Sequence, residues 1–389
     1  MSFSLKSIFE KRIGVIHTKH GNIHTPTFVF CATKGALKGV CNWQFNCELL
    51  LCNAFHLFPH MNVIKNVGIH EFMNWKGPMM CDSGGYQIFS LGYHSVSQDI
   101  NNEQKGKYDD KNKMKWETEI KGSRKKSINR RKITEEGCTF SWNGEKLFLS
   151  PEESMRIQHE LGVDIVVAFD ECTPVHYNEK QTEESMLRSM RWGFRCLNYF
   201  KENNIIDQKL YGVVQGGVFP HLRLKSIEHV NKEAYDGVAI GGTLGKTKEE
   251  MYNIVDFTLN HLCEEKPRHL LGIGHIGDIL RFAPRIDTFD CVEPTRLARH
   301  GTLLMPEGKI YIKKAIYEKN FQHLNCKCKT CENYSLAYLH HLWKIKDLSV
   351  YGALSIHNMH IMNELMIEIR HAIEKNNYEK VLNRWQFYI

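Results

Sequence analysis

The stretch Asp164-Ile165-Val166-Val167-Ala168-Phe169, which runs into Asp170-Glu171-Cys172, decides the fold class. Its apolar residues follow one another without polar alternation, which is typical of a strand buried on both faces in a parallel sheet. A helical pattern over residues 178–203 comes next in the chain. A buried strand that leads into a long helix is the repeating unit of an α/β fold.

Runs of the same kind recur along the chain, and many are followed by helical patterns, such as residues 220–234 and 247–263. The eight candidate strands are 26–31, 48–53, 78–81, 164–169, 210–214, 237–240, 269–271 and 287–289. Such strands in alternation with helices predict a (β/α)8 barrel of the TIM type.

The segment between the third and fourth runs carries the residues that begin and end a helix. Ser150 is a favourable N-cap and Pro151 fits the first helical position. Glu152 and Glu153 complement the helix dipole, and Gly162 suits the end of the helix. We therefore expect a helix between these two boundaries.

Polar residues follow the predicted strands at the point where each one ends. They are Asp82, Asp170, Gln215, the pair Gly241-Gly242, residues 272–274 and Asp290. The carboxyl ends of the strands converge on the active-site face of such a barrel. Since a packing residue has no reason to be Asp or Gln at successive strand ends, we expect these residues to form the active site.

Two of these carboxylates, Asp82 and Asp290, suit the cleavage of a bond to an anomeric carbon. One can attack or stabilise the oxocarbenium-like carbon while the other manages protons. Arg296, Arg299 and His300 follow Asp290 and are placed to meet phosphates, although a solvated loop could carry the same residues.

Other groups suit a planar base. Asp170 can accept two hydrogen bonds from an edge such as N1–H and the exocyclic amine of guanine, or it can be a buried salt-bridge partner. Gln215 adds an amide donor, and the pair 241–242 exposes backbone N–H groups suited to a base carbonyl. Tyr86 offers a stacking face after the glycine pair 84–85, a motif that a plain turn would also explain.

Cys326, Cys328 and Cys331, with His357 downstream, form the most specific metal-binding pattern in the chain. Three thiolates and one imidazole complete a tetrahedral Zn²⁺ shell without an open position, so we predict a structural site with one zinc ion per subunit. The rival fourth ligands are His340, His341 and His360.

The 389 residues are 42% hydrophobic and 24% charged, an ordinary globular balance without an apolar stretch of membrane-spanning length. The N-terminal residues lack the apolar core of a secretory signal. We therefore expect a cytoplasmic protein whose thirteen cysteines are free thiols or metal ligands. The net charge of +7 fits an anionic partner. Part of that charge lies in residues 98–133, which we interpret as a disordered or extended insertion, either without function or touching phosphate.

Taken in order along the chain, these motifs closely resemble tRNA-guanine transglycosylase. The matching segments are 53–57, 72–75, 82–87, 170–174, 214–217, 289–296 and the cysteine and histidine set. The resemblance implies one irregular barrel over residues 1–389, with a zinc-binding subdomain over 303–360. It also implies replacement of guanine by a 7-deazaguanine, in a ping-pong reaction, at the wobble position of GUN anticodons. Such anticodons belong to the tRNAs for aspartate, asparagine, histidine and tyrosine.

The resemblance also implies roles for single residues. Asp290 would be the nucleophile that bonds to ribose C1′, and Asp82 the general acid and base. The implied base-binding residues are Ser83, Gly84, Gly85, Tyr86, Asp170, Gln215, Gly242, Gly245 and Leu271. The implied RNA-binding residues are Gly272, Ile273, Gly274, His275, Ile276, Gly277, Asp278, Thr295, Arg296, Leu297, Ala298 and Arg299. The family works as a dimer, and both a homodimer and a heterodimer with a non-catalytic paralogue fit the sequence.

Some positions depart from the family pattern. Thr247 stands where a Glu usually orients the base site in bacterial enzymes, and His275 replaces a Thr or Tyr. Gly245 resembles eukaryotic enzymes, where it makes room for the cyclopentenediol of queuine, whereas Cys172 resembles bacterial ones. We predict queuine as the incoming base, with its precursor 7-aminomethyl-7-deazaguanine as the alternative.

Two other classes of protein fit parts of the pattern. A non-catalytic paralogue that binds RNA or pairs with a catalytic subunit would have no need for both carboxylates and the base-reading pair. An unrelated zinc-stabilised barrel hydrolase would need a catalytic metal or a water-activating group, and the predicted metal site is closed. An active transglycosylase is therefore the prediction.

Overall fold

The computed structural model describes residues 2–8, 11–90, 131–142 and 145–389. Its centre is a closed barrel of eight parallel strands in the order β10-β11-β12-β13-β14-β4-β5-β6. These strands are β4 (Thr27–Cys31), β5 (Leu49–Asn53), β6 (Met79–Asp82), β10 (Ile165–Val167), β11 (Lys209–Val214), β12 (Gly237–Ile240), β13 (Arg268–Leu270) and β14 (Thr288–Asp290). All eight predicted strands are confirmed, and so is the (β/α)8 fold class.

The barrel strands are buried along nearly their whole length, which explains why they lack polar alternation in the sequence. One detail of the prediction was wrong. Asp82 and Asp290 are the last residues of β6 and β14, whereas the sequence suggested that they follow these strands. The strand pairing therefore holds the backbone of both carboxylates.

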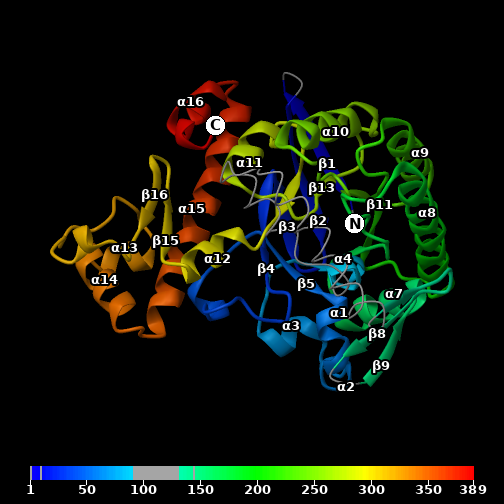
Figure 1. Ribbon diagram of the computed structural model, residues 1–389, viewed down its shortest axis with the longest axis horizontal. Coiled ribbons are helices and arrows are strands. Elements are labelled where there is room, and N and C mark those ends of the chain that lie inside the picture. Colours follow the sequence, from blue (N-terminus) through cyan, green and yellow to red (C-terminus); the bar gives the residue numbers. More distant parts are fainter. Residues whose placement is uncertain (1, 9–10, 91–130, 143–144) are drawn as a thin grey trace, which may run out of the picture.

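Helices of very different length connect and surround the strands (Figure 1). Between β4 and β6 the elements are η1 (Asn42–Gln44), α1 (Ala54–Leu57), η2 (Phe58–His60), α2 (Met61–Ile64) and α3 (Gly68–Met73), and α4 (Gly85–Ser90) follows β6. The longer barrel helices are α7 (Pro151–Leu161), α8 (Glu179–Glu202), α9 (Pro220–Lys232), α10 (Lys248–His261) and the short α11 (Ile276–Phe282). The alternation of strand and helix is thus regular in the second half of the barrel and irregular in the first.

Helix α7 begins and ends where the sequence predicts. Ser150 Oγ accepts a hydrogen bond from Glu153 N at 3.1 Å, which satisfies one of the free N–H groups of the first turn. Gly162 ends the helix in the left-handed region, with φ of 72°.

Two antiparallel sheets accompany the barrel. One is built from β1 (Phe3–Ile8), β2 (Lys11–Thr18) and β3 (Gly21–Thr25), and the other from β7 (Arg131–Ile133), β8 (Cys138–Trp142) and β9 (Glu145–Leu149). The second sheet changes the predicted bounds of the insertion over residues 98–133. The last three residues of that segment, 131–133, form strand β7, which pairs with β8. Residues 98–130 lie outside the described part of the chain.

After β14 the chain builds a second, smaller group of elements beside the barrel (Figure 1). They are α12 (Glu293–Arg299), β15 (Thr302–Met305), β16 (Gly308–Tyr311), η3 (Ala315–Tyr317), α13 (Lys329–Asn333), α14 (Leu336–Lys344) and α15 (Ser349–Glu374). A separate apolar cluster, which includes Leu303, Leu339 and Leu354, holds this group together. Helix α15 contacts both α12 and barrel strand β4, and it leads to α16 (Glu379–Arg384) and η4 (Gln386–Tyr388).

None of the helices among the described residues combines the length and the apolar character that a membrane crossing needs.

Candidate active site and metal centre

Asp82 stands at the carboxyl end of β6, beside the neighbouring strand β5. Asn53 is its register partner on β5, and Asn53 Nδ2 donates to Asp82 Oδ2 at 2.7 Å. Burial, together with the charges of Asp170 and Asp290, raises the pKa of Asp82 to about 7. A carboxyl group with that pKa can both give and take a proton near neutral pH. Asn53 lies in a motif that the sequence singles out, but its role as the partner of Asp82 was not predicted.

Asp290 ends β14, and its two carboxylate oxygens have different surroundings. Gly272 N donates to Asp290 Oδ1 at 2.7 Å. The Cys31 thiol lies 3.9 Å from Oδ2, where it can be only a weak donor. Gly272 is also one of the predicted RNA-binding residues, and its backbone N–H contacts the predicted nucleophile.

Asp170 and Gln215 meet across the strand ends of β10 and β11. Gln215 Nε2 donates to Asp170 Oδ2 at 2.7 Å, and Ser83 Oγ donates to Asp170 Oδ1 at 3.3 Å. Burial raises the pKa of Asp170 to about 6, although these two hydrogen bonds oppose the increase. Gln215 Oε1 is buried and has no hydrogen-bond partner among the described residues. A buried acceptor of this kind is suited to a ligand donor.

Glycines let the backbone approach this pair closely. A Cβ at Gly85 would lie 2.3 Å from the Asp170 carbonyl oxygen and 2.5 Å from its carboxylate. A Cβ at Gly242 would lie 2.3 Å from Gln215 Oε1, and Gly242 also has φ of 57°. Larger residues therefore do not fit at either position.

Arg223 of α9 donates hydrogen bonds to the glycine loops around residues 217 and 241–242. This role was not predicted from the sequence. Its guanidinium is fully buried and donates through Nη1 to the carbonyl oxygens of Gly241 at 3.0 Å, Gly217 at 3.3 Å and Gly242 at 3.3 Å. No carboxylate pairs with it in the described part of the chain, and burial lowers its pKa to about 9. The charge of Arg223 thus rests on carbonyl oxygens of the glycine loops.

The segment 245–250 includes Thr247, one of the departures from the family pattern. Thr247 caps α10, since its Oγ1 accepts from Glu250 N at 3.1 Å. Glu250 in turn accepts from Lys246 N at 2.6 Å. A Cβ at Gly245 would lie 2.7 to 2.9 Å from Glu250 atoms, so the Glu250 side chain lies directly beside Gly245. Glu250 is thus a carboxylate of this segment that lies beside Gly245.

Tyr86 and Leu271, two of the predicted base-binding residues, come from opposite sides of the strand ends. Tyr86 lies in α4 and is 38% exposed. Leu271 is half-buried after β13, and its Cδ1 lies 3.5 Å from where a Gly241 Cβ would stand. Their contact with the base stays a prediction.

The predicted RNA-binding residues divide into two groups by burial. Six are buried and hold the backbone of their segments in place: Ile273, Gly274, Ile276, Asp278, Thr295 and Ala298. Six are at least partly exposed: Gly272, His275, Gly277, Arg296, Leu297 and Arg299. Burial lowers the pKa of His275, whose Nδ1 accepts from Gly277 N at 3.3 Å and caps α11.

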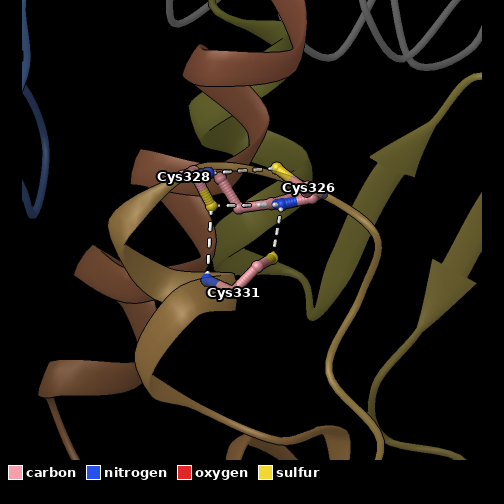
Figure 2. A group of neighbouring side chains, drawn as sticks. Cys326, Cys328 and Cys331 are labelled. Carbon is pink, nitrogen blue, oxygen red and sulfur yellow. Dashed lines mark hydrogen bonds between the residues drawn. The ribbon is translucent and has the colours of Figure 1, made fainter.

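The cysteines and the histidine of the predicted zinc site lie together. The ligand atoms of Cys326, Cys328, Cys331 and His357 are all within 4.8 Å of one another, and Figure 2 shows the three cysteine side chains where the chain enters α13. His357 Nδ1 lies 3.2 Å from Cys331 Sγ, while its Nε2–H donates to Leu304 O at 2.8 Å. That second bond orients the ring, as is usual for a metal-binding histidine. The donor set thus fits one metal ion.

The rival histidines have other contacts. His340 Nδ1 lies 2.7 Å from Ile312 O, and His341 stacks on Tyr338 with ring centroids 6.3 Å apart. His360 interacts with Cys326 but is not a member of the four-residue cluster.

His20, His70 and Asp164 form a second cluster, at the opposite end of the barrel. Asp164 lies 3.0 Å from His20 Nδ1 and 3.5 Å from His70 Nε2, and it accepts from Met79 N at 2.9 Å. The imidazole rings stack with centroids 3.6 Å apart and an interplanar angle of 17°. A bound metal lies close to the plane of each imidazole, and two stacked rings share no such point. The cluster is therefore a hydrogen-bonded anchor between the β2–β3 turn and the barrel.

Fold and site together define a barrel enzyme with paired carboxylates at the carboxyl ends of its strands. The chain belongs to the queuine tRNA-ribosyltransferase family, whose model matches residues 8–124 and 111–387. The queuine tRNA-ribosyltransferase of Staphylococcus haemolyticus is 39% identical over 377 residues, which cover 94% of this chain and 89% of that protein. The protein of the same name from Protochlamydia amoebophila is 38% identical over 376 residues, 94% of this chain and 92% of that protein. The resemblance to this family is confirmed.

Proposed function

We propose that this protein exchanges guanine in tRNA for queuine, as a tRNA-guanine transglycosylase. The observation that carries the proposal is the meeting of two carboxylates, Asp82 and Asp290, with the bonded pair of Asp170 and Gln215 at one end of the barrel. The names of the relatives support the same activity. A protein that only bound RNA would gain nothing from a carboxyl group whose pKa burial and neighbouring charges raise to about 7.

Asp170 and Gln215 are the residues that we assign to the base edge. The Asp170 carboxylate can accept from guanine N1–H and the exocyclic amine, and the Gln215 amide can donate to O6. In the structure the amide donates to Asp170, so base binding replaces part of an existing interaction. Ser83 and the glycines at 84, 85 and 242 let the base approach the backbone. The nucleotide has to be flipped out of its stack to reach these groups.

The exchange proceeds in two displacements at ribose C1′. In the first, Asp290 forms a C1′–O bond while the C1′–N9 bond breaks and its electron pair leaves with guanine. Asp82 supplies the proton that the departing guanine takes up. In the second, Asp82 takes the N9 proton of the entering 7-deazaguanine, whose nitrogen bonds to C1′ as the C1′–O bond breaks. The enzyme ends in its starting state, without a cofactor.

Queuine is the incoming base that we favour, because Gly245 has no side chain. The neighbour in that space is Glu250, so its carboxylate would face the substituent on the base. A Gly245→Val variant would also push against α10, which makes direct competition between bases the better test. In the test, tRNA that carries labelled guanine is incubated with the enzyme and either queuine or 7-aminomethyl-7-deazaguanine, and the release of label is compared. We expect queuine to displace more label. More effective displacement by 7-aminomethyl-7-deazaguanine would overturn the choice of queuine.

The partner is tRNA with a GUN anticodon, and the half-buried Arg296 and Arg299 are the candidates for contacts with its phosphates. We assign the barrel over residues 1–389 as one domain and residues 303–360 as its zinc-binding subdomain, with one structural zinc ion on Cys326, Cys328, Cys331 and His357. The expected assembly is a dimer that works in the cytoplasm. Light scattering of the purified chain, alone and with added paralogue, separates a homodimer from a heterodimer.

Exchange of radiolabelled guanine into a GUN-anticodon tRNA tests the proposed function. The wild type is expected to incorporate the label and to form an RNA adduct that survives denaturing electrophoresis. Asp290→Asn is expected to lose both the exchange and the adduct while it still binds tRNA in a gel-shift assay. Full exchange by this variant would overturn the assignment of the nucleophile, and no exchange by the wild type would overturn the function.

A further inference from the structure

His269 is a buried histidine next to the predicted nucleophile, and neither the sequence motifs nor the proposed mechanism uses it. It lies in the middle of β13, with its side chain fully buried, and Thr288 on β14 is its register partner. Its Nδ1 is 2.9 Å from the Thr288 hydroxyl oxygen. Its Nε2 is 3.3 Å from Asp290 Oδ1.

The Nε2 atom is buried and has no aligned hydrogen bond among the described residues, although Asp290 is so close. A buried polar atom without a partner is costly, so native proteins rarely keep one without a reason. Hydrogen bonds at catalytic groups are often long or misaligned before substrate binds, and they tighten in the complex. A small rotation of the Asp290 carboxylate would complete the hydrogen bond between His269 Nε2 and Asp290 Oδ1.

The two oxygens of Asp290 are therefore not equivalent. Oδ1 accepts a hydrogen bond from Gly272 N at 2.7 Å, and His269 Nε2 lies 3.3 Å from the same oxygen. Among the described residues, Oδ2 has only the Cys31 thiol, at 3.9 Å. The oxygen with strong donors stays bound to the protein, and the oxygen without them is free to react.

We propose that His269 is a positioning residue for Asp290. Its ring accepts from Thr288 at Nδ1 and donates from Nε2 to Oδ1, which leaves Oδ2 as the oxygen that bonds to ribose C1′. This inference rests on the proposed function and adds the reacting atom and its partner to it.

A hydrogen-bond donor at Asp290 Oδ1 affects the two displacements at ribose C1′ differently. When the C1′–Oδ2 bond forms, the carboxylate loses its negative charge and Oδ1 becomes the carbonyl oxygen of an ester. When the C1′–Oδ2 bond breaks, its electron pair returns to the carboxylate and the charge spreads onto Oδ1. Donors at Oδ1 bind the charged oxygen more strongly than the ester carbonyl, so they assist mainly the second displacement. Loss of the His269 donor should therefore make the covalent adduct accumulate.

Three variants separate this role from a packing role. His269→Phe keeps a ring and removes the donor, while His269→Gln keeps an N–H group that can reach Oδ1. Tyr211→Phe is the control, because the Tyr211 hydroxyl is, like His269 Nε2, a buried polar group of the barrel without a hydrogen-bond partner among the described residues. Each variant is measured for guanine exchange, for the share of enzyme held as RNA adduct and for its melting temperature.

His269→Phe is expected to lower kcat by ~10–100-fold, with KM for tRNA nearly unchanged and a larger adduct fraction than in the wild type. His269→Gln is expected to recover most of the rate, and Tyr211→Phe to match the wild type. Wild-type kcat in His269→Phe, or equal losses in the Phe and Gln variants without more adduct, would overturn the proposal. A wild type without exchange would instead count against the proposed function.

Nitrogen-15 NMR of the imidazole gives a readout that does not depend on activity. The chemical shifts of His269 are expected to place the proton on Nε2 in the wild type. A proton on Nδ1 would overturn the proposal whatever the exchange assay shows.

Discussion

Asn53 Nδ2 donates to Asp82 Oδ2 at 2.7 Å between two neighbouring parallel strands, in register at their carboxyl ends. The same amide nitrogen lies 2.9 Å from Gln87 Oε1. The hydrogen bond from Asn53 lowers the pKa of Asp82, against the larger effects of burial and of the charges of Asp170 and Asp290. Asn53 therefore offsets part of the rise in the pKa of Asp82.

Removal of this bond should shift the pH dependence of exchange. Asn53→Ala is expected to raise the pKa of Asp82 further above its ordinary value, because the donor that favours the charged form is lost. The acidic limb of the pH–rate profile would then shift to higher pH by about one pH unit. Steady-state exchange between pH 5 and 9 checks this shift. A profile that does not move, or that moves downward, would mean that Asp82 is not the titrating base.

Two substitutions beside Asp170 should differ sharply in effect. Ser83→Ala removes one hydrogen bond at 3.3 Å, so KM for guanine is expected to rise a few-fold, by about the free energy of one hydrogen bond. Gly85→Ala would place a Cβ 2.3 Å from the Asp170 carbonyl oxygen, and the base site should lose most of its affinity. Competition with unlabelled guanine measures both. Similar effects of the two variants would show that Asp170 is free to move.

Asp164 should contribute stability that depends on pH. Burial alone would raise the pKa of Asp164. Hydrogen bonds from His70 and Met79 N, together with the charge interaction with His20, outweigh the effect of burial and lower this pKa to about 2. Since the folded pKa lies below the unfolded value near 4, the contribution is complete above about pH 4 and is lost as the pH falls through about 2. Asp164→Asn should therefore cost on the order of 2 kcal/mol at pH 7 and much less at pH 2.5. Urea unfolding at both pH values gives the comparison, and a constant difference would contradict the linkage.

The cysteine cluster should hold one zinc ion per chain. Cys328→Ser is expected to lose the metal and the order of the segment around α13, since zinc contributes on the order of 10 kcal/mol at structural sites of this kind. Cys41→Ser is the matched control, because Cys41 is an exposed thiol outside the cluster. Metal analysis by mass spectrometry and thermal unfolding of both variants provide the readout. A Cys328→Ser protein with full metal content and normal unfolding would rule out the site.

The barrel strands, the α7 boundaries and the zinc ligands could be predicted because each has a local signature. Apolar runs mark the strands, Ser150 and Gly162 mark the helix ends, and three thiols within six residues mark a metal site. The contacts of Asn53, Arg223 and His269 have no such signature. Arg223 and His269 reach their partners across the fold, and only the packing of strands and helices brings them together.

The predicted RNA-binding segments also contain side chains whose burial the sequence motif did not reveal. A sequence motif marks a whole segment and does not say which of its side chains point inward. Ile276 and Asp278 are buried, and Asp278 accepts from Lys248 and Tyr252, whereas Arg296 and Arg299 remain accessible.

By itself the sequence determined the barrel, and it pointed to the carboxylates at the strand ends and to the three cysteines of the cluster. Strand burial, helix capping and thiol spacing all act over short distances in the chain. The tertiary structure decided how those groups behave. The pKa of Asp82 near 7, the Gln215–Asp170 bond and the approach of His269 to Asp290 depend on burial and on distances between strands. Desolvation and charge interactions of this kind exist only once the chain has closed into a barrel.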